Sequence, residues 1–478
     1  MPDPTAQNEN PIIVWFRRDL RLRDNPALHR AVQSGKPVIA LYIFETDIGR
    51  PVGGASAWWL HHSLASLAAD LQALGVALHI RKGKADEKLQ ALITASGAQH
   101  VVWNRRYTKE DRDRDALIKQ RLISSGITAE TFRANLLSEP WEIETKTGGY
   151  YKVFTPYWRA ALTNFNIAPA IKAPKHIRPH KEIGGGLKLE ELNLLPISPD
   201  WGKKLEPHWE VGEDGAAKSL AAFLSDPVET YTEDRNRPDI KSGTSRLSPH
   251  LANGEISPRQ IWQACQRNPE AARKFLSEVG WREFSYVLLF HNPALRNQNF
   301  KPSFDGFEWQ DNPDALRAWQ RGQTGYPFVD AGMRQLWQTG WQHNRVRMVT
   351  ASFLIKHLLI DWREGEAWFH DTLVDYDPAS NAASWQWVAG SGADAAPYFR
   401  IFNPFTQGEK FDPNGDYVRA FIPELKNLPN KFIHRPWDAP DSVLKDAGVT
   451  LGVTYPRPIV NHKHAREAAL AAYKRTKP

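Results

Sequence analysis

The chain has 478 residues, and its 61 lysines and arginines exceed its 54 aspartates and glutamates, which gives a formal net charge of +7. This length allows two or more domains, and the positive charge suits a polyanionic partner. The single cysteine, Cys265, excludes a disulfide framework and a thiolate metal cluster, and no run of about 20 apolar residues predicts a membrane helix. We therefore expect a soluble, cytoplasmic monomer without a bound metal. The opening MPDPTAQNEN carries no targeting pattern, so we expect a frayed terminus there.

The first third of the chain alternates between strand and helix patterns. Short apolar or β-branched runs predict strands at 11–16, 37–44, 76–81, 99–103 and 127–132. Helical patterns lie between them, as in residues 55–75, where leucines recur at helical spacing. This alternation predicts an α/β domain over residues 1–135, with a Rossmann-like parallel sheet covered by helices on both faces. No GxGxxG or GxxxxGK[ST] follows a predicted strand, so the usual phosphate-binding fingerprints are missing.

The remainder of the chain changes character twice. Residues 136–210 are rich in proline and glycine and carry scattered charge, which predicts a long linker running over the surface. Residues 211–478 consist mostly of helical patterns, for example at 257–266, 271–290 and 312–322. The expected architecture is an α/β domain, a linker and a larger all-α domain.

The stretch GTSRLSPHLANGEISP, residues 243–258, gathers polar groups in front of a predicted helix. Thr244, Ser245, Arg246 and Ser248 offer hydroxyls and a guanidinium that suit a phosphate or pyrophosphate. Ordinary helix capping explains the same serines and threonine, so both interpretations stay open.

A second candidate stretch is TGWQHNRVRMVTASFLIKHLLIDW, residues 339–362, which starts polar and becomes apolar within two turns. Arg347 shares a predicted helix face with Asn344 and Met348. A buried guanidinium needs an acid or a bound anion, and Asp375 is a candidate partner. A structural ion pair and a ligand site are both compatible with this pattern.

The third stretch, residues 373–419, places Asp375, Asp377, Asn381, Trp385 and Trp387 within thirteen positions among small residues. Buried aspartate and asparagine are costly when unpaired and usually indicate a ligand, although a polar core is an alternative. The 19 tryptophans of the chain suit a large core, stacking on a planar ligand, or a one-electron relay.

Several long motifs resemble the photolyase and cryptochrome family. They are FRRDLRLRDNPAL (16–28), GTSRLSPHLANGEIS, WREF (281–284), TGYPFVDAGMRQLWQTGWQHNRVRM (324–348), IDWREGE (360–366) and SWQWVAGSGADAAPYFRIFNP (384–404). The similarity runs almost end to end, through YPRPIVNHKHARE near the C-terminus. Within the family the chain most resembles the cyclobutane pyrimidine dimer (CPD) photolyases of the prokaryotic class III branch, relatives of plant cryptochromes.

The resemblance implies that the helical domain binds FAD. The implied contacts are Tyr231, Thr244, Ser245, Arg246, Leu247, Ser248, Arg347, Asp375, Asp377 and Asn381. Asn381 would face flavin N5, where a neutral amide accommodates an anionic reduced flavin and an acid could instead protonate the ring. Trp385, Trp362 and Trp309 match the chain that carries an electron from the surface to the photoexcited flavin.

The resemblance also implies a pocket for a DNA lesion. Glu278, Trp281, Asn344, Met348 and Trp387 would surround a flipped-out pyrimidine dimer, with Asn381 at the flavin, although plain core packing also explains the two tryptophans. Arg345 and Lys410 would contact the DNA backbone. The implied activity is that of a deoxyribodipyrimidine photo-lyase, a carbon–carbon lyase in which photoexcited reduced FAD gives an electron to the dimer and then recovers it.

A second, antenna chromophore is common in this family, and we expect 5,10-methenyltetrahydrofolate in preference to an 8-hydroxy-deazaflavin. WNRRYTKEDRDRD, residues 103–115, resembles a folate-binding stretch, but Glu110 stands where an asparagine is typical and Asp111 keeps the adjacent acid. Trp58 and Trp59 are candidates for stacking on the antenna, although core burial is the more common role for each.

Three other functions compete with CPD repair. A (6-4) photolyase presents a histidine pair to its lesion, whereas here His343 is followed by Asn344 and Met348. A plant-type cryptochrome, which signals through partner proteins, has an acid at the Asn381 position and usually a long tail, whereas this sequence ends with AALAAYKRTKP. A bare DNA-binding module would leave the buried polar set unexplained.

Overall fold

The computed structural model describes residues 10–181, 183–396 and 399–476. Most of the predicted frayed terminus and two residues of the 384–404 motif lie outside these ranges. The chain forms two compact units. Unit 1 comprises Pro156–Leu224, Arg246–Pro293 and the described residues up to Tyr151, and unit 2 comprises Lys152–Thr155, Ser225–Ser245 and the described residues from Ala294 onward. Because the units interleave along the chain, they do not test the predicted domain boundaries at 135 and 210.

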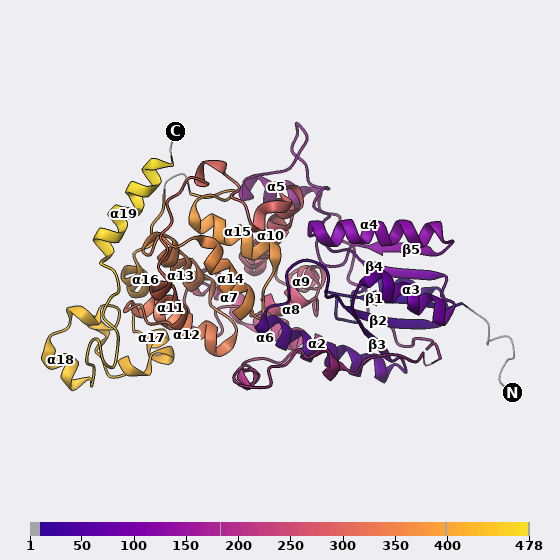
Figure 1. Cartoon of the computed structure of the whole chain (residues 1–478), viewed down its shortest axis with the longest axis horizontal. Coiled ribbons are helices and arrows are strands. Elements are labelled where there is room, and N and C mark those ends of the chain that lie inside the picture. The colour runs from indigo at the N-terminus through magenta and orange to yellow at the C-terminus, as the bar shows by residue number, and fades with distance from the viewer. Residues whose placement is uncertain (1–9, 182, 397–398, 477–478) are drawn as a thin grey trace. The chain divides into compact units, whose positions relative to one another are not determined.

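Unit 1 is built on a five-stranded parallel sheet with the order β3-β2-β1-β4-β5 (Figure 1). The strands are β1 (Ile12–Phe16), β2 (Val38–Phe44), β3 (Leu78–Lys82), β4 (His100–Asn104) and β5 (Thr128–Phe132). Each predicted strand is present, and the predicted parallel sheet is confirmed.

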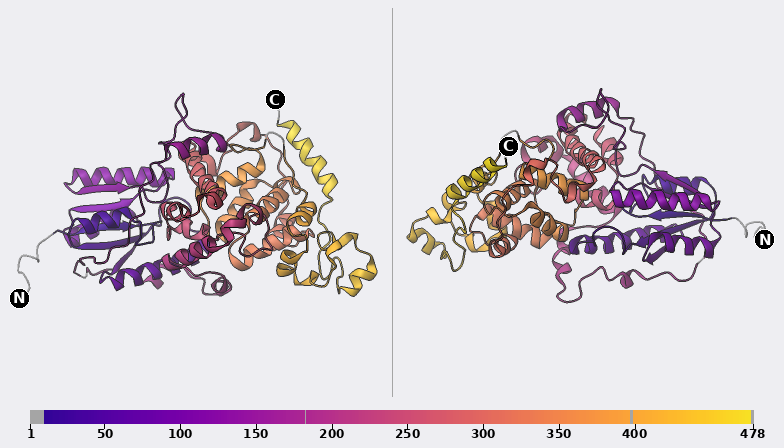
Figure 2. Two further views of the ribbon diagram at one scale, coloured as in Figure 1. Left: turned by 180° about the vertical axis from the view of Figure 1, so that it is seen from behind. Right: turned by 45° about the horizontal axis from the view of Figure 1, so that its top comes forward.

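Helices cover both faces of this sheet, as the two views of Figure 2 show. The alternate residues Ile12, Val14 and Phe16 of β1 pack with α1 (Pro26–Gln33) and α2 (Gly54–Ala73). Ile13 and Trp15 point the other way and pack with α3 (Ala85–Ser96) and α4 (Lys109–Ser124). Burial on both faces explains why β1 reads as a continuous apolar run.

The predicted linker at 136–210 is more structured than expected. It contains a helix that the sequence patterns did not indicate, α5 (Phe154–Asn164), and it buries Leu137, Tyr157 and Ile177. The prediction of a purely surface-running connector was therefore wrong, because these apolar side chains fill core positions. The later helices assigned wholly or mainly to unit 1 are α6 (Glu213–Ser225), α8 (Ser248–Asn253), α9 (Pro258–Cys265) and α10 (Pro269–His291).

Unit 2 is helical. Its helices are α7 (Pro227–Asp234), α11 (Pro313–Arg321), α12 (Pro327–Thr339), α13 (Asn344–Lys356), α14 (Trp362–Thr372), α15 (Pro378–Ala389), α16 (Pro404–Phe411), α17 (Asp416–Phe421), α18 (Asp441–Asp446) and α19 (His462–Arg475). No helix in the described part of the chain is long and apolar enough to cross a membrane.

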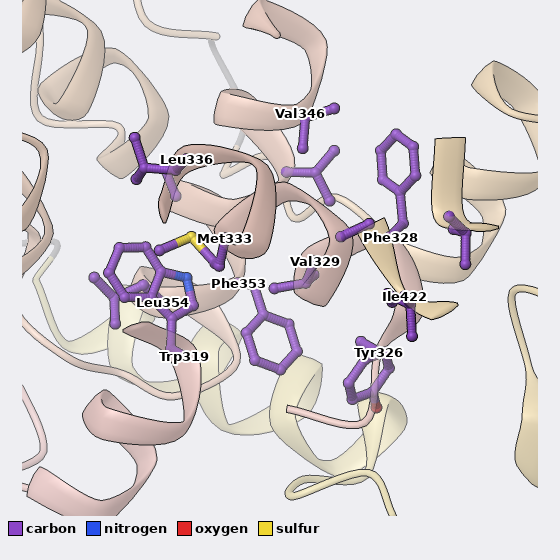
Figure 3. Packing of buried hydrophobic residues seen from close by; sticks show 14 of the residues in the cluster. Trp319, Tyr326, Phe328, Val329, Met333, Leu336, Val346, Phe353, Leu354 and Ile422 are labelled. Carbon is purple, nitrogen blue, oxygen red and sulfur yellow. The ribbon is translucent and has the colours of Figure 1, made fainter. Parts of the chain in front are cut away.

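The core of unit 2 explains the change of character along residues 339–362. Val346, Phe353 and Leu354 of α13 pack with Val329 and Met333 of α12 (Figure 3). The first turn of α13 is more accessible, because Asn344 is exposed and Arg347 and Met348 are half-buried. The helix therefore begins at a surface and ends in the core.

Candidate functional site

The predicted ion pair between Arg347 and Asp375 is present in unit 2. The guanidinium Nη2 of Arg347 donates to Asp375 Oδ2 at 2.7 Å, and its Nε donates to the carbonyl oxygen of Gln342 at 2.7 Å. The Asp375 side chain is only 3% exposed. Burial of this carboxylate is tolerable because a hydrogen-bonded cation compensates its charge.

The start of α15 holds the next two polar residues. Asp377 is the N-cap and accepts from the backbone N–H groups of Ala379 at 3.1 Å and Ser380 at 2.8 Å. One turn later, Asn381 Nδ2 donates to Glu366 Oε1 at 2.9 Å. Asn381 Nδ2 also donates to the backbone carbonyl oxygen of Glu366 at 3.3 Å, so two acceptors of Glu366 fix the orientation of the Asn381 amide. Glu366 lies in the IDWREGE motif, but it was not predicted as a site residue.

The three predicted electron-transfer tryptophans lie in unit 2, two of them buried and one half-buried. Trp385 is 2% exposed and packs edge-on against Phe369 with ring centroids 5.0 Å apart. Trp362 is fully buried and donates from Nε1 to Asn299 Oδ1 at 3.0 Å, whereas Trp309 is half-buried. Trp385 and Trp362 are thus buried and Trp309 is the most accessible of the three, which suits an electron path that ends at the surface.

A glycine permits the close packing of α14 and α15 beside this path. A Cβ atom at Gly365 would lie 2.1 Å from Cη2 of Trp385, far inside van der Waals contact. Any larger residue at this position would displace the Trp385 ring. The conformation of Trp385 therefore depends on a residue that the sequence analysis did not single out.

The two predicted DNA-contacting residues lie against one aromatic ring in unit 2. The guanidinium of Arg345 is 4.4 Å and the ammonium of Lys410 is 5.3 Å from the ring centroid of Phe411. Burial lowers the pKa of Arg345, and the nearby charges of Arg235 and Arg400 lower it further. Cations that destabilise one another in this way favour a bound anion, such as a DNA phosphate. Arg235 and Arg400 were not predicted.

The remaining flavin-binding candidates lie around α7 and α8. Tyr231 is buried on α7, and Thr244 and Ser245 are half-buried in unit 2, whereas Arg246, Leu247 and Ser248 belong to unit 1. The N-cap of α8 is Leu247, and it makes no side-chain capping hydrogen bond. The side chain of Leu247 therefore does not cap α8.

The predicted lesion residues are divided between the units. In unit 1, Glu278 Oε1 forms an ion pair with Lys274 Nζ at 3.0 Å. Trp281 is half-buried on the same helix, α10. In unit 2, Asn344 and Met348 lie on the accessible side of α13. Trp387 is half-buried on α15 and donates from Nε1 to the carbonyl oxygen of Asp394 at 3.0 Å. All five side chains therefore keep some access to solvent.

A buried acid anchors α10. Glu283 accepts from the backbone N–H groups of Leu137 at 2.7 Å and Ser138 at 3.4 Å, and burial raises its pKa from 4.5 to about 7. Between pH 4.5 and about 7 the Glu283 carboxyl holds its proton more tightly in the folded chain than in the unfolded chain. Its contribution to the free energy of unfolding therefore falls as the pH rises through this range.

We therefore expect Glu283→Gln to raise the thermal midpoint more at about pH 8 than at about pH 5. Glutamine keeps an acceptor for the Leu137 N–H and carries no charge. Thermal unfolding of both proteins across this range measures the difference. A gain that is the same at both pH values would contradict the buried-charge explanation.

The two tryptophans considered for antenna stacking lie in the core, which was the more common role expected for each. Trp58 and Trp59 are 2% and 0% exposed, so neither is accessible for stacking on a chromophore in this structure. In the 103–115 stretch, Asp111 is buried between Arg106 at 3.1 Å and Arg114 at 3.3 Å, while Glu110 is exposed. The buried acid of this stretch, Asp111, is thus already paired with two arginines of the chain.

Comparison with known proteins identifies the family. A family model described as "FAD binding domain of DNA photolyase" matches residues 275–475, and one described as "DNA photolyase" matches residues 12–175. A deoxyribodipyrimidine photo-lyase of Agrobacterium fabrum is 54% identical over 468 residues, which cover 97% of each chain. The chain belongs to the photolyase and cryptochrome family.

Other family members are similar over nearly the whole chain. Cryptochrome-1 of Arabidopsis thaliana is 38% identical over 95% of this chain and 69% of its own length. A crystal structure of a bacterial class III photolyase from Agrobacterium tumefaciens matches with a TM-score of 0.96 and 52% identity over 100% of both chains. An archaeal photolyase from Sulfolobus tokodaii matches with a TM-score of 0.82 and 29% identity, over 97% of this chain and 100% of that one.

The photolyase-like unit 2 also fits the FAD that its family model describes. The buried Nε1 of Trp385 and Nε2 of His343 have no hydrogen-bond partner among the described residues. His343 Nδ1 accepts from the backbone N–H of Arg345 at 3.2 Å, so the neutral ring carries its proton on Nε2. Buried N–H donors are normally paired, and acceptors outside the chain would satisfy both.

Proposed function

We propose that this chain is a light-driven lyase that splits cyclobutane pyrimidine dimers in DNA with bound FAD. The observation that carries the proposal is the combination, within unit 2, of the hydrogen-bonded residues Arg347, Asp375 and Asn381 with two buried tryptophans and one half-buried tryptophan. A polar ligand site and a one-electron path in one compact unit suit a flavin that is reduced through the protein. When bound, FAD would supply the photoexcited electron to the dimer and accept it back.

The polar residues have distinct roles in this proposal. Arg347 and Asp375 would hold the flavin ring, and Asp377 together with Tyr231 and Thr244–Ser248 would hold the sugar and phosphates. Asn381, oriented by Glu366 at 2.9 Å, presents a neutral amide to the flavin. An uncharged group there leaves an anionic reduced flavin without a competing negative charge.

The lesion would be held by the residues that the family resemblance implies. Trp281 and Trp387 would form aromatic walls for the flipped dimer, Glu278 and Asn344 would hydrogen-bond the pyrimidine edges, and Met348 would complete the pocket. Arg345 and Lys410, which share the ring of Phe411, would bind the DNA backbone. A dimer that gained the electron would break its two cyclobutane bonds, and return of the electron would leave no net redox change.

The (6-4) alternative is disfavoured by the state of His343. This histidine is the N-cap of α13, and burial together with Arg345 and Arg347 lowers its pKa to about 3. It is therefore neutral near physiological pH, and the next two lesion-facing positions are Asn344 and Met348 instead of further histidines. The cryptochrome alternative is disfavoured because Asn381 is not an acid.

For the antenna we propose 5,10-methenyltetrahydrofolate in preference to a deazaflavin, based on the class III similarity. Its contacts are not Trp58 and Trp59 as they lie in this structure, since both are buried. Absorption of the purified protein near the folate band, followed by chemical identification of the released chromophore, tests this choice. A released deazaflavin would contradict it.

Replacing Trp385 by phenylalanine separates photoreduction from repair. Phenylalanine preserves ring packing against Phe369, but it is much harder to oxidise, so we expect light-driven reduction of oxidised FAD to slow at least about 10-fold. Repair by chemically prereduced protein should stay within about 2-fold of wild type. Flavin absorbance under illumination and lesion counting measure the two activities. Equal loss of both would contradict the relay assignment.

Light-dependent survival of ultraviolet-irradiated bacteria that lack a photolyase tests the proposed function in cells. Expression of this chain should increase survival under blue light but not in the dark. The Trp281→Ala variant, expressed at the same level, is the matched control. Equal survival in light and dark would contradict the proposal.

A further inference from the structure

Arg246 adopts an unusual backbone conformation beside an aromatic ring. Its φ of 52° lies in the left-handed region, which residues other than glycine rarely occupy. The guanidinium carbon lies 4.2 Å from the ring centroid of Trp209. Strained residues keep their conformation only where the surrounding structure holds them, and they gather at functional sites. Trp209 is therefore a candidate for the group that holds Arg246.

The ring of Trp209 rests on a rigid, buried support within unit 1. It packs edge-on against Trp59, with ring centroids 5.3 Å apart and an interplanar angle of 73°. Trp59 Nε1 donates to Glu255 Oε1 at 2.8 Å, and Glu255 Oε2 is hydrogen-bonded to Nδ1 of His250. Trp59, Glu255 and His250 are all buried. These hydrogen bonds thus connect α2 to α8 and to the loop that follows α8.

We propose that Trp209 is a positioning residue for FAD, which holds the Arg246 guanidinium ready for the FAD diphosphate by cation–π stacking. This inference rests on the proposed FAD-dependent function. Arginine has many rotamers, so ordering its side chain before binding removes part of the entropic cost of binding an anion. The planar guanidinium can stack on an indole while its N–H groups remain available to phosphate oxygens.

The stacking explains an otherwise unassigned residue. Trp209 lies one residue before the end of the 136–210 region, outside every motif that predicted flavin contacts. Its role is indirect, because it acts through Arg246 and does not itself need to touch the flavin. An effect on FAD binding should consequently depend on Arg246 being present.

A double-mutant cycle tests this dependence. FAD dissociation constants are measured by fluorescence titration of apoprotein for wild type, Trp209→Leu, Arg246→Gln and the double variant. We expect Trp209→Leu to weaken FAD binding about 5- to 20-fold, and Trp209→Phe to restore it to within about 2-fold of wild type. In the Arg246→Gln background, Trp209→Leu should add less than about 2-fold.

Controls separate positioning from general packing. Trp201→Leu changes another tryptophan of the same region and should leave FAD affinity unchanged, and Trp209→Met replaces Trp209→Leu if the leucine variant does not fold. An unchanged affinity in Trp209→Leu, or an equal loss with and without Arg246, would overturn the inference while leaving the proposed function intact. A wild-type protein that binds no FAD would overturn both.

Discussion

Arg347→Leu should destabilise the folded protein by about 3 kcal/mol and abolish stable retention of FAD. The reason is that Asp375, 3% exposed, would lose the guanidinium that donates to it at 2.7 Å. Removing one partner of a buried ion pair leaves an uncompensated charge, which costs more than the pair itself contributes. Thermal or urea unfolding measures the stability, and flavin absorbance after gel filtration measures retention.

The pair of Arg363 and Asp361 provides a matched control. Its contact is 2.9 Å long, but the two side chains are 36% and 28% exposed. Water screens this pair, so Arg363→Leu should cost less than about 1 kcal/mol and leave FAD bound. Similar losses of stability in Arg347→Leu and Arg363→Leu would contradict the explanation that burial of Asp375 makes its pair with Arg347 important. The double variant Arg347→Leu with Asp375→Asn should recover part of the stability by removing the unpaired charge.

Trp281→Ala should weaken the binding of DNA containing a thymine dimer about 10- to 100-fold, while the FAD content stays at the wild-type level. Stacking of a base on an aromatic ring contributes about 1–3 kcal/mol, and alanine removes this surface. Fluorescence anisotropy with a single-lesion oligonucleotide measures the affinity. Glu278 lies on the same helix, and Glu278→Ala should also lower repair because it removes a group that would hydrogen-bond the pyrimidine edges.

Trp141→Ala is the control for this variant. Trp141 is 42% exposed and its ring centroid lies 5.1 Å from that of Phe290 on α10, so the variant removes a tryptophan that packs against the same helix without changing the proposed lesion residues. Dimer affinity should be unchanged in this control. If Trp281→Ala binds the dimer with unchanged affinity while the flavin stays bound, Trp281 is not a lesion-pocket residue and has an ordinary packing role.

The sheet and the Arg347–Asp375 pair could be predicted from sequence for simple physical reasons. Strand and helix patterns alternate with short connections, which restricts the fold to a parallel sheet with helices on both faces. A half-buried arginine needs a negative partner, and Asp375 lies in the next polar stretch. Both predictions depend on local pattern and charge, which a sequence shows directly.

Other features depend on tertiary contacts that a sequence does not show. Trp58 and Trp59 occupy successive positions about 100° apart on a helix, so a one-sided amphipathic pattern would bury only one of them. Both are buried because α2 also has neighbours away from the sheet, where Trp59 bonds Glu255 at 2.8 Å. The Glu366 contact to Asn381 was missed for the same reason, since the two residues are fifteen positions apart on different helices.

The most direct test of the central claim is repair of a synthetic oligonucleotide carrying one thymine cyclobutane dimer. The protein is prereduced and illuminated with blue light, beside a (6-4) substrate and a dark control. We predict light-dependent loss of the cyclobutane dimer alone. No repair of either lesion by protein that holds photoreducible FAD would contradict the assignment as a lyase and favour a cryptochrome-type receptor.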